Sequence, residues 1–244
     1  MKLLIIRHGD PDYEHDSLTE KGFREAEYLS ERLAAMNIDH FYVSPLGRAA
    51  DTLAPTLKKN GMSAEICPWL REFDTARIQR PDVTDRPMIP WDWLPQDWMK
   101  DERFFQKDHW FEHPVFQASR VKENYDYVTT ELDRLLARHG YVREGCLYRA
   151  ENPSNERIAL VCHMGLECVL LSHLLNISPM IIWHGICALP TSVTTVVTEE
   201  RRAGIASFRA IGIGDVSHLY SHGEEPSFSA RFCECYTNED ERHD

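Results

Sequence analysis

The stretch Leu3-Leu4-Ile5-Ile6-Arg7-His8-Gly9 decides the fold class of this 244-residue chain. Its first four residues form a short apolar run, partly β-branched, which is typical of a strand buried on both faces of a sheet. The run stops at Arg7 and His8, and the Gly and Pro of Gly9-Asp10-Pro11 indicate a loop. A central strand is therefore predicted to deliver two polar side chains to one edge of a sheet.

Strand and helix patterns alternate along most of the chain. This alternation predicts an α/β fold, with a mainly parallel central sheet flanked by helices and an antiparallel pair at one edge. The predicted strands are residues 3–6, 40–43, 66–70 and 158–162, and the predicted antiparallel pair is 192–198 with 205–213. Residues 143–156 are polar and predict a loop.

Two predicted helices have clear signals. Ser17-Leu18-Thr19-Glu20 has the spacing of a capping box, and an apolar stripe follows that consists of Phe23, Ala26, Leu29, Leu33 and Met36. A second stripe begins at Val121 and stops at Gly140, a residue that commonly ends helices.

The region between these helices has a different composition. Five of the six tryptophans fall between Trp69 and Trp110, among several prolines, and residues 73–118 show no sustained period. We expect an irregular Trp/Pro-rich insertion laid over the core. The expected organisation is one domain over residues 1–235, with an acidic tail at 236–244.

The charge and cysteine content exclude some classes of function. A formal net charge of −12 argues against nucleic acid or an anionic membrane as the main partner, although a local cluster of Arg and His can still bind an anion. Seven cysteines, an odd number, indicate reduced thiols, and Cys233-x-Cys235 lacks a second ligand pair, so no metal is expected. No apolar run is long enough for a signal peptide or a membrane span, so the expected location is the cytoplasm.

Three predicted strand ends carry polar residues that suit one chemistry. Arg7 and His8 follow the first strand, Arg48 lies just past the second, and His163 follows residues 158–162. The carboxyl ends of strands line the binding crevice of an open α/β sheet. Arginines bind phosphate oxygens with paired donors, and a neutral imidazole beside them can attack phosphorus.

These segments resemble the signatures of the histidine phosphatase superfamily, which has the phosphoglycerate-mutase-like fold. The matching blocks are Arg7-His8-Gly9, residues 44–52 (SPLGRAADT) and Val161-Cys162-His163-Met164-Gly165. They occur in the family's order, each after a predicted strand. The segments 18–22 (LTEKG) and 215–219 (DVSHL) also look like recurring family segments.

The resemblance implies a role for each site residue. His8 would be the nucleophile, Arg7 and Arg48 would hold the phosphate, and His163 would complete the pocket. The family's proton donor is a Glu shortly after the second helix, and Glu72 fits that placement. An alkoxide leaves poorly without a proton, so the chemistry requires such a group. Neither a metal nor an organic cofactor is implied.

Departures from the family pattern favour hydrolysis over phosphoryl transfer between substrates. The mutase branch usually has Ser or Thr two residues after the Gly of RHG and Asn three residues further on, where this chain has Pro11 and Glu14. We therefore expect a phosphomonoesterase for a small phosphorylated metabolite. Two alternatives stay open, a phosphoglycerate-type mutase and a catalytically idle protein that binds a phospho-ligand. Self-association into a homo-oligomer also stays open.

Other polar residues near these motifs have weaker signals. Asp10 and Tyr13 lie close to the expected pocket in the sequence and could contact substrate. His184 and His218 are interpreted as structural.

Overall fold

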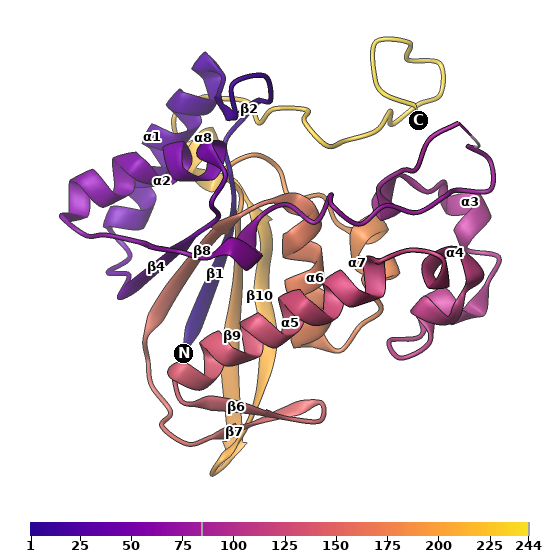
Figure 1. The fold of residues 1–244 in the computed structure, drawn as a ribbon. Coiled ribbons are helices and arrows are strands. Elements are labelled where there is room, and N and C mark those ends of the chain that lie inside the picture. The colour runs from indigo at the N-terminus through magenta and orange to yellow at the C-terminus, as the bar shows by residue number, and fades with distance from the viewer. Residues whose placement is uncertain (84, 244) are drawn as a thin grey trace.

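A computed structural model describes residues 1–83 and 85–243, which form an eight-stranded mixed sheet with helices on both faces (Figure 1). The strand order is β5-β4-β8-β1-β9-β10-β7-β6. The parallel half consists of β1 (Lys2–Arg7), β4 (His40–Val43), β5 (Glu65–Ile66) and β8 (Arg157–Cys162). The antiparallel half consists of β6 (Tyr141–Glu144), β7 (Leu147–Ala150), β9 (Val193–Arg202) and β10 (Ile205–Asp215).

Strand β1 lies inside the sheet, as its apolar run predicts. It pairs in parallel with β8 and antiparallel with β9. Leu3 and Ile5 belong to the apolar cluster on one face, and Leu4 and Ile6 belong to the cluster on the other. The α/β prediction is confirmed. The antiparallel part consists of four strands rather than the one predicted pair, because β6–β7 forms a second hairpin beside the β9–β10 hairpin.

The first helices cover one face of the sheet (Figure 1). Helix α1 spans Glu20–Ala34 and α2 spans Gly47–Asn60. The predicted capping box was wrong by two residues: Thr19 is the N-cap and accepts from the Gly22 N–H, whereas Ser17 lies in the short hairpin of β2 (Pro11–Asp12) and β3 (Ser17–Leu18). Phe23 is 49% exposed, so the buried part of the predicted apolar stripe of α1 begins at Ala26.

Two predicted segments differ in the structure. The strand expected at 66–70 is only β5, because the chain enters the 3₁₀ helix η1 (Pro68–Leu70) and proline cannot donate to a strand ladder. The expected loop at 143–156 was also wrong, since it contains most of the β6–β7 hairpin, turning at Gly145 with φ +60°. Strands at the edge of a sheet face water, so the polar composition of β6 and β7 resembles that of a loop.

The opposite face of the sheet carries α5 (Val121–Arg138), α6 (Met164–Leu175) and α7 (Pro179–Gly185) (Figure 1). The insertion precedes them and forms short helical turns; within residues 73–83 and 85–118 its strand pairing is a single bridge between Ile78 and Met88. These turns are η2 (Pro90–Asp92), α3 (Pro95–Trp98), η3 (Glu102–Phe105), η4 (Trp110–Glu112) and α4 (Pro114–Gln117).

The insertion contributes rings to the core itself. Trp93, Trp98 and Trp110 are at most 3% exposed and join the same apolar cluster as the residues of α5 and α6. The aromatic-rich insertion predicted from composition is therefore present, and its tryptophans anchor it to the fold.

The last helix, α8 (Ser217–Tyr220), is followed by residues 221–243, which we call the C-terminal segment. This segment crosses above the carboxyl ends of the strands and reaches the side of the insertion (Figure 1). The predicted boundary of an acidic tail at 236 stays a prediction, and residue 244 lies outside the described residues. No helix within the described residues has the length and apolar character needed to cross a membrane.

Candidate functional site

The structure brings the five predicted site residues together at the carboxyl ends of the parallel strands. Arg7 ends β1 and His8 follows it, Arg48 lies in the first turn of α2 after β4, and His163 joins β8 to α6 as its N-cap. Glu72 lies just past η1. The neighbouring parallel strands β4, β8 and β1 therefore place these side chains together, as expected for carboxyl ends in one sheet.

His8 is buried, with 2% of its surface exposed. Its Nδ1 lies 2.7 Å from the carbonyl oxygen of Gly9. A carbonyl only accepts, so Nδ1 carries the hydrogen and Nε2 keeps its lone pair. Burial lowers the pKa of His8 well below its usual value, and the charges of Arg7 and Arg48 lower it further. The ring is therefore neutral near pH 7 and able to act as a nucleophile.

His163 lies beside His8, with the two ring centroids 5.0 Å apart. Its Nε2 is 2.7 Å from the Ser44 hydroxyl oxygen. Burial lowers the pKa of His163 well below the ordinary value, and the neighbouring His8 and the two arginines act in the same direction. Two neutral imidazoles thus face a cluster of fixed positive charge.

Arg7 is almost fully buried beneath the C-terminal segment. Its Nη1 donates to the carbonyl oxygen of Ala188 at 2.7 Å. The same guanidinium contacts Ser229, with Nη1 3.1 Å from the carbonyl oxygen and Nη2 3.0 Å from the hydroxyl. No sequence motif indicates this contact, because Ser229 lies in a segment without a recognised motif.

Arg48 is positioned by the loop before β3. Its Nη1 lies 2.6 Å from Asp16, and the other carboxylate oxygen of Asp16 accepts from the Gly47 N–H at 2.7 Å. The guanidinium also lies 5.4 Å from the centre of the exposed Tyr13 ring. Asp16 therefore fixes both the first turn of α2 and the arginine on it, a role that its loop position did not indicate.

Three buried nitrogen atoms of this cluster have no hydrogen-bond partner among the described residues. They are Nε of Arg7, Nε of Arg48 and Nδ1 of His163. Buried polar atoms are usually satisfied, so such a concentration requires an explanation. A tetrahedral anion with several acceptor oxygens matches the two cations and this group of unpaired nitrogens.

Glu72 is held by two backbone groups. Its Oε1 accepts from the Phe73 N–H at 2.8 Å and from the Leu166 N–H at 3.1 Å, which leaves Oε2 to carry a proton. Burial raises the pKa of Glu72, and the positive charge of Arg7 partly opposes this rise. The carboxyl group thus keeps its proton to a higher pH than an exposed glutamate does.

A second buried carboxyl group, Glu167, escaped the sequence analysis. It lies in the first turn of α6 and is fully buried. Burial raises the pKa of Glu167 to about 7, with Arg7 lowering it and Glu72 raising it. The available signal was a single charged residue inside the apolar run that forms α6.

Close backbone packing holds the loop that carries His8. A Cβ on Gly22 would lie 2.2 Å from the carbonyl oxygen of Asp10, so this segment of α1 approaches the loop as only glycine allows. Asp10 accepts from the hydroxyls of Thr19 and Ser227, so its carboxylate is engaged with protein groups.

The two histidines interpreted as structural, His184 and His218, both contact protein groups through their ring nitrogens. His184 Nδ1 is 2.8 Å from the Met180 carbonyl, and its Nε2 is 3.0 Å from the Trp93 carbonyl, so it joins α7 to the insertion. His218 Nε2 lies 3.1 Å from the Thr191 hydroxyl, and burial lowers the pKa of His218 to about 4.

One group of side chains with metal-ligand chemistry occurs within residues 1–83 and 85–243. It consists of His40 and Glu156, at the amino ends of β4 and β8, and His139, the C-cap of α5, and it lies opposite the candidate site. His139 already pairs with Glu156, at 2.9 Å, and with the Tyr42 hydroxyl. No step at the candidate site involves this group.

Comparisons with known proteins agree with this architecture. The family model of the histidine phosphatase superfamily (branch 1) matches residues 3–210. Two curated relatives match shorter stretches: a 2,3-bisphosphoglycerate-dependent phosphoglycerate mutase of Thermoplasma acidophilum, 39% identical over 59 residues, and a probable phosphoglycerate mutase of Cronobacter sakazakii, 32% identical over 89 residues. These matches cover 20% and 33% of this chain, and only 30% and 41% of the relatives' own lengths.

Solved structures share the fold over most of their length. A phosphoserine phosphatase variant of Entamoeba histolytica in complex with phosphoserine has a TM-score of 0.59 at 19% identity, covering 89% of this chain and 98% of that chain. A mycobacterial glucosyl-3-phosphoglycerate phosphatase with inorganic phosphate has a TM-score of 0.58 at 18% identity, with the same coverage. The α-ribazole phosphatase of Shigella flexneri has a TM-score of 0.53 at 17% identity, covering 88% and 97%.

Proposed function

Because this chain belongs to branch 1 of the histidine phosphatase superfamily, we propose that it is a phosphomonoester hydrolase that works through a phosphohistidine on His8. The observation that carries the proposal is the state of the His8 ring. It is buried and neutral, its Nδ1 donates to the Gly9 carbonyl, and Nε2 keeps its lone pair beside Arg7 and Arg48. Neutral imidazole is a nucleophile, while its protonated form is not.

The arginines and His163 would bind the phosphoryl group. In the structure the terminal nitrogens of Arg7 contact Ala188 and Ser229, and Arg48 contacts Asp16. A phosphate dianion forms stronger, charge-assisted hydrogen bonds than the neutral Ser229 oxygens do, so it would displace Ser229 from Arg7. As charge develops on the phosphoryl oxygens in the transition state, the same donors would stabilise it.

The chemistry then takes two steps. His8 Nε2 attacks phosphorus, an N–P bond forms, and the bond from phosphorus to the ester oxygen breaks with its electron pair on that oxygen. Glu72 gives its proton to the departing oxygen, a role supported by its raised pKa. Water then attacks the phosphohistidine and gives a proton to the Glu72 carboxylate, and the N–P electron pair returns to His8 as inorganic phosphate forms.

Hydrolysis of a small phosphorylated metabolite is the outcome we favour over phosphoryl transfer. Of the solved phosphatases named above, the Entamoeba histolytica variant was captured with phosphoserine, a small phosphorylated metabolite. The curated relatives are phosphoglycerate mutases, which makes a mutase the second candidate. Pro11 and Glu14 replace residues usual in the mutase branch, and this favours the hydrolase.

The decisive experiment traps the intermediate. Wild-type protein mixed briefly with ³²P-labelled substrate and denatured in alkali should carry an acid-labile, base-stable label on His8. His8→Ala should carry none and should lose several orders of magnitude in phosphate release. The proposal fails if His8→Ala retains full activity.

Two further assays separate the alternatives. Interconversion of phosphoglycerate isomers without net phosphate release would identify a mutase. Binding of phosphate esters with neither label nor release would identify an idle binding protein.

A further inference from the structure

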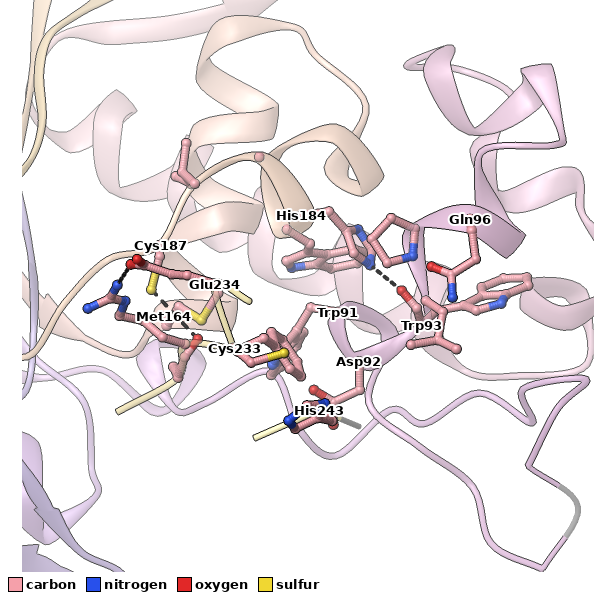
Figure 2. Close-up of a pocket in the computed structure, with 18 of the residues that line it drawn as sticks. Trp91, Asp92, Trp93, Gln96, Met164, His184, Cys187, Cys233, Glu234 and His243 are labelled. Atoms are coloured by element: carbon pink, nitrogen blue, oxygen red, sulfur yellow. Dashed lines mark hydrogen bonds and ion pairs between the residues drawn. The ribbon is translucent and has the colours of Figure 1, made fainter. Parts of the chain in front are cut away.

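A pocket of about 710 Å³ adjoins the candidate site (Figure 2). Its walls come from four parts of the chain: the insertion around Trp91, Met164 at the start of α6, the end of α7, and the C-terminal segment around Phe232. The volume lies in the range of sites that hold small organic ligands.

The pocket begins next to the phosphate-binding groups. Met164, in its wall, directly follows His163. Ala230, also in the wall, directly follows Ser229, and Ser229 contacts Arg7. An ester whose phosphorus lies beside these groups therefore has this space available for the group bonded to its oxygen.

Aromatic rings form much of the wall. The ring of Trp91 lies against the first turn of α6, where a Cβ on Gly165 would come within 2.2 Å of it. The Trp91 and Trp183 ring centroids are 6.1 Å apart. The aromatic residues of the wall are Trp91, Trp93, Trp183, Phe232 and Tyr236, of which Trp93 and Trp183 are at most 3% exposed. Such surfaces favour a flat ring, which can stack or pack edge to face against them.

The charged groups of the wall are already paired. Arg231 contacts Glu234, and Asp92 lies 2.8 Å from Arg242. Both ring nitrogens of His184 face backbone carbonyl oxygens. A carboxylate or ammonium on the leaving group would have to compete with the exposed Arg231–Glu234 pair or with the pair on the buried Asp92, whereas an uncharged group would not.

We propose that this pocket receives the leaving group, and that the substrates are phosphomonoesters of uncharged alcohols that carry a planar ring system. The inference rests on the proposed function and narrows its substrate class. Recognition would come from burying ring surface between the insertion and the C-terminal segment, while Arg7 and Arg48 hold the phosphate. Small charged esters such as phosphoserine would leave the pocket largely unfilled.

The test compares esters whose alcohols have similar basicity, so that only the pocket contact differs. Naphthylethyl phosphate should exceed ethyl phosphate in kcat/KM by roughly 30-fold or more, the effect expected from burying about 100 Å² of apolar surface. Phosphoserine should fall near ethyl phosphate. Equal rates for naphthylethyl and ethyl phosphate, or a preference for phosphoserine, would overturn the inference.

Two variants test whether the pocket wall is the source of the preference for naphthylethyl phosphate. Phe232→Ala should reduce kcat/KM for naphthylethyl phosphate by about tenfold and leave ethyl phosphate unchanged. Tyr127→Ala removes a ring of similar size that is 51% exposed on α5, outside the pocket wall, and should change neither substrate. An equal loss on both substrates for Phe232→Ala would contradict a leaving-group role.

A binding experiment distinguishes failure of this inference from failure of the proposed function. Naphthylethylphosphonate, which cannot be hydrolysed, should bind more tightly than ethylphosphonate, measured by quenching of tryptophan fluorescence or by calorimetry. If no ester is hydrolysed, p-nitrophenyl phosphate included, the hydrolase proposal fails while the binding result still decides the pocket. Equal affinities of the two phosphonates would end the pocket inference even in an active enzyme.

Discussion

Ser229 places both of its oxygens on the guanidinium of Arg7, 222 residues away in the sequence. The contact closes the C-terminal segment over the carboxyl end of β1. It also occupies the Arg7 donors to which the proposed mechanism assigns phosphate, so phosphate and Ser229 would compete for the same arginine.

Removing the Ser229 hydroxyl should therefore strengthen phosphate binding. Ser229→Ala deletes one of the two contacts to Arg7 and leaves the backbone carbonyl in place. A net hydrogen bond contributes about 1 kcal/mol, so the inhibition constant of inorganic phosphate should fall by about 2- to 10-fold. Ser221→Ala, whose hydroxyl donates to the His218 carbonyl, serves as the matched control and should change nothing. Weaker phosphate binding by Ser229→Ala would instead make the hydroxyl a ligand of phosphate.

Glu72→Gln separates acid catalysis from phosphate binding. The change keeps the side-chain size and removes the transferable proton, so kcat on alkyl phosphates should fall by about 10²–10³, the usual contribution of acid catalysis. The fall on p-nitrophenyl phosphate should be much smaller, because nitrophenolate leaves without a proton. Glu20→Gln, on an almost fully exposed side chain, is the control.

The pH profile of the wild-type enzyme should report the same group. In the proposed mechanism the protonated form of Glu72 is the active one in the first step, and burial raises the pKa of Glu72. Activity on alkyl esters should hold at low pH and decline as pH rises through this raised pKa, with the decline absent in Glu72→Gln. Equal losses of Glu72→Gln on alkyl and nitrophenyl esters would assign Glu72 to structure or phosphate positioning.

Glu167→Gln should stabilise the protein at alkaline pH only. The pKa of this buried carboxyl rises from 4.5 to about 7 on folding, so the folded state holds the proton more tightly than the unfolded state. The corresponding stability is present below pH 4.5 and is lost as pH rises toward 7, amounting to on the order of 3 kcal/mol. Thermal unfolding at pH 5 and pH 8 should show a gap in melting temperature between variant and wild type, and this gap should widen with pH. A gap independent of pH would show that Glu167 is not the titrating group.

Gly22→Ala should destabilise the fold although it lies in a helix. Alanine ordinarily stabilises a helix relative to glycine by roughly 0.5–1 kcal/mol. At this position its Cβ would meet the Asp10 carbonyl oxygen at 2.2 Å, a backbone atom that cannot rotate away. The melting temperature should drop, and Gly185→Ala, whose added Cβ meets nothing within 4 Å, should not lower it. A Gly22→Ala protein as stable as wild type would show that the loop before β2 can shift freely.

Local patterns predicted the elements whose residues face a uniform environment. β1, β4 and β8 are buried on both faces, and α5 carries a regular stripe, so composition and periodicity located them closely. The β6–β7 hairpin lies at the sheet edge, where polar side chains face water, and its sequence is typical of a loop. In the insertion, buried tryptophans are spaced by turns of irregular length, so no period identified the elements.

The family can be recognised from local sequence, and so can the candidate residues, because each is tied to a short motif beside a strand or helix end. These residues are Arg7, His8, Arg48, Glu72 and His163. Tertiary structure alone decided what surrounds them: Asp16 on Arg48, Ser229 on Arg7, and the aromatic pocket between the insertion and the C-terminal segment. These contacts join residues from distant parts of the chain. No local pattern encodes them, since they depend on how far each loop extends before it packs.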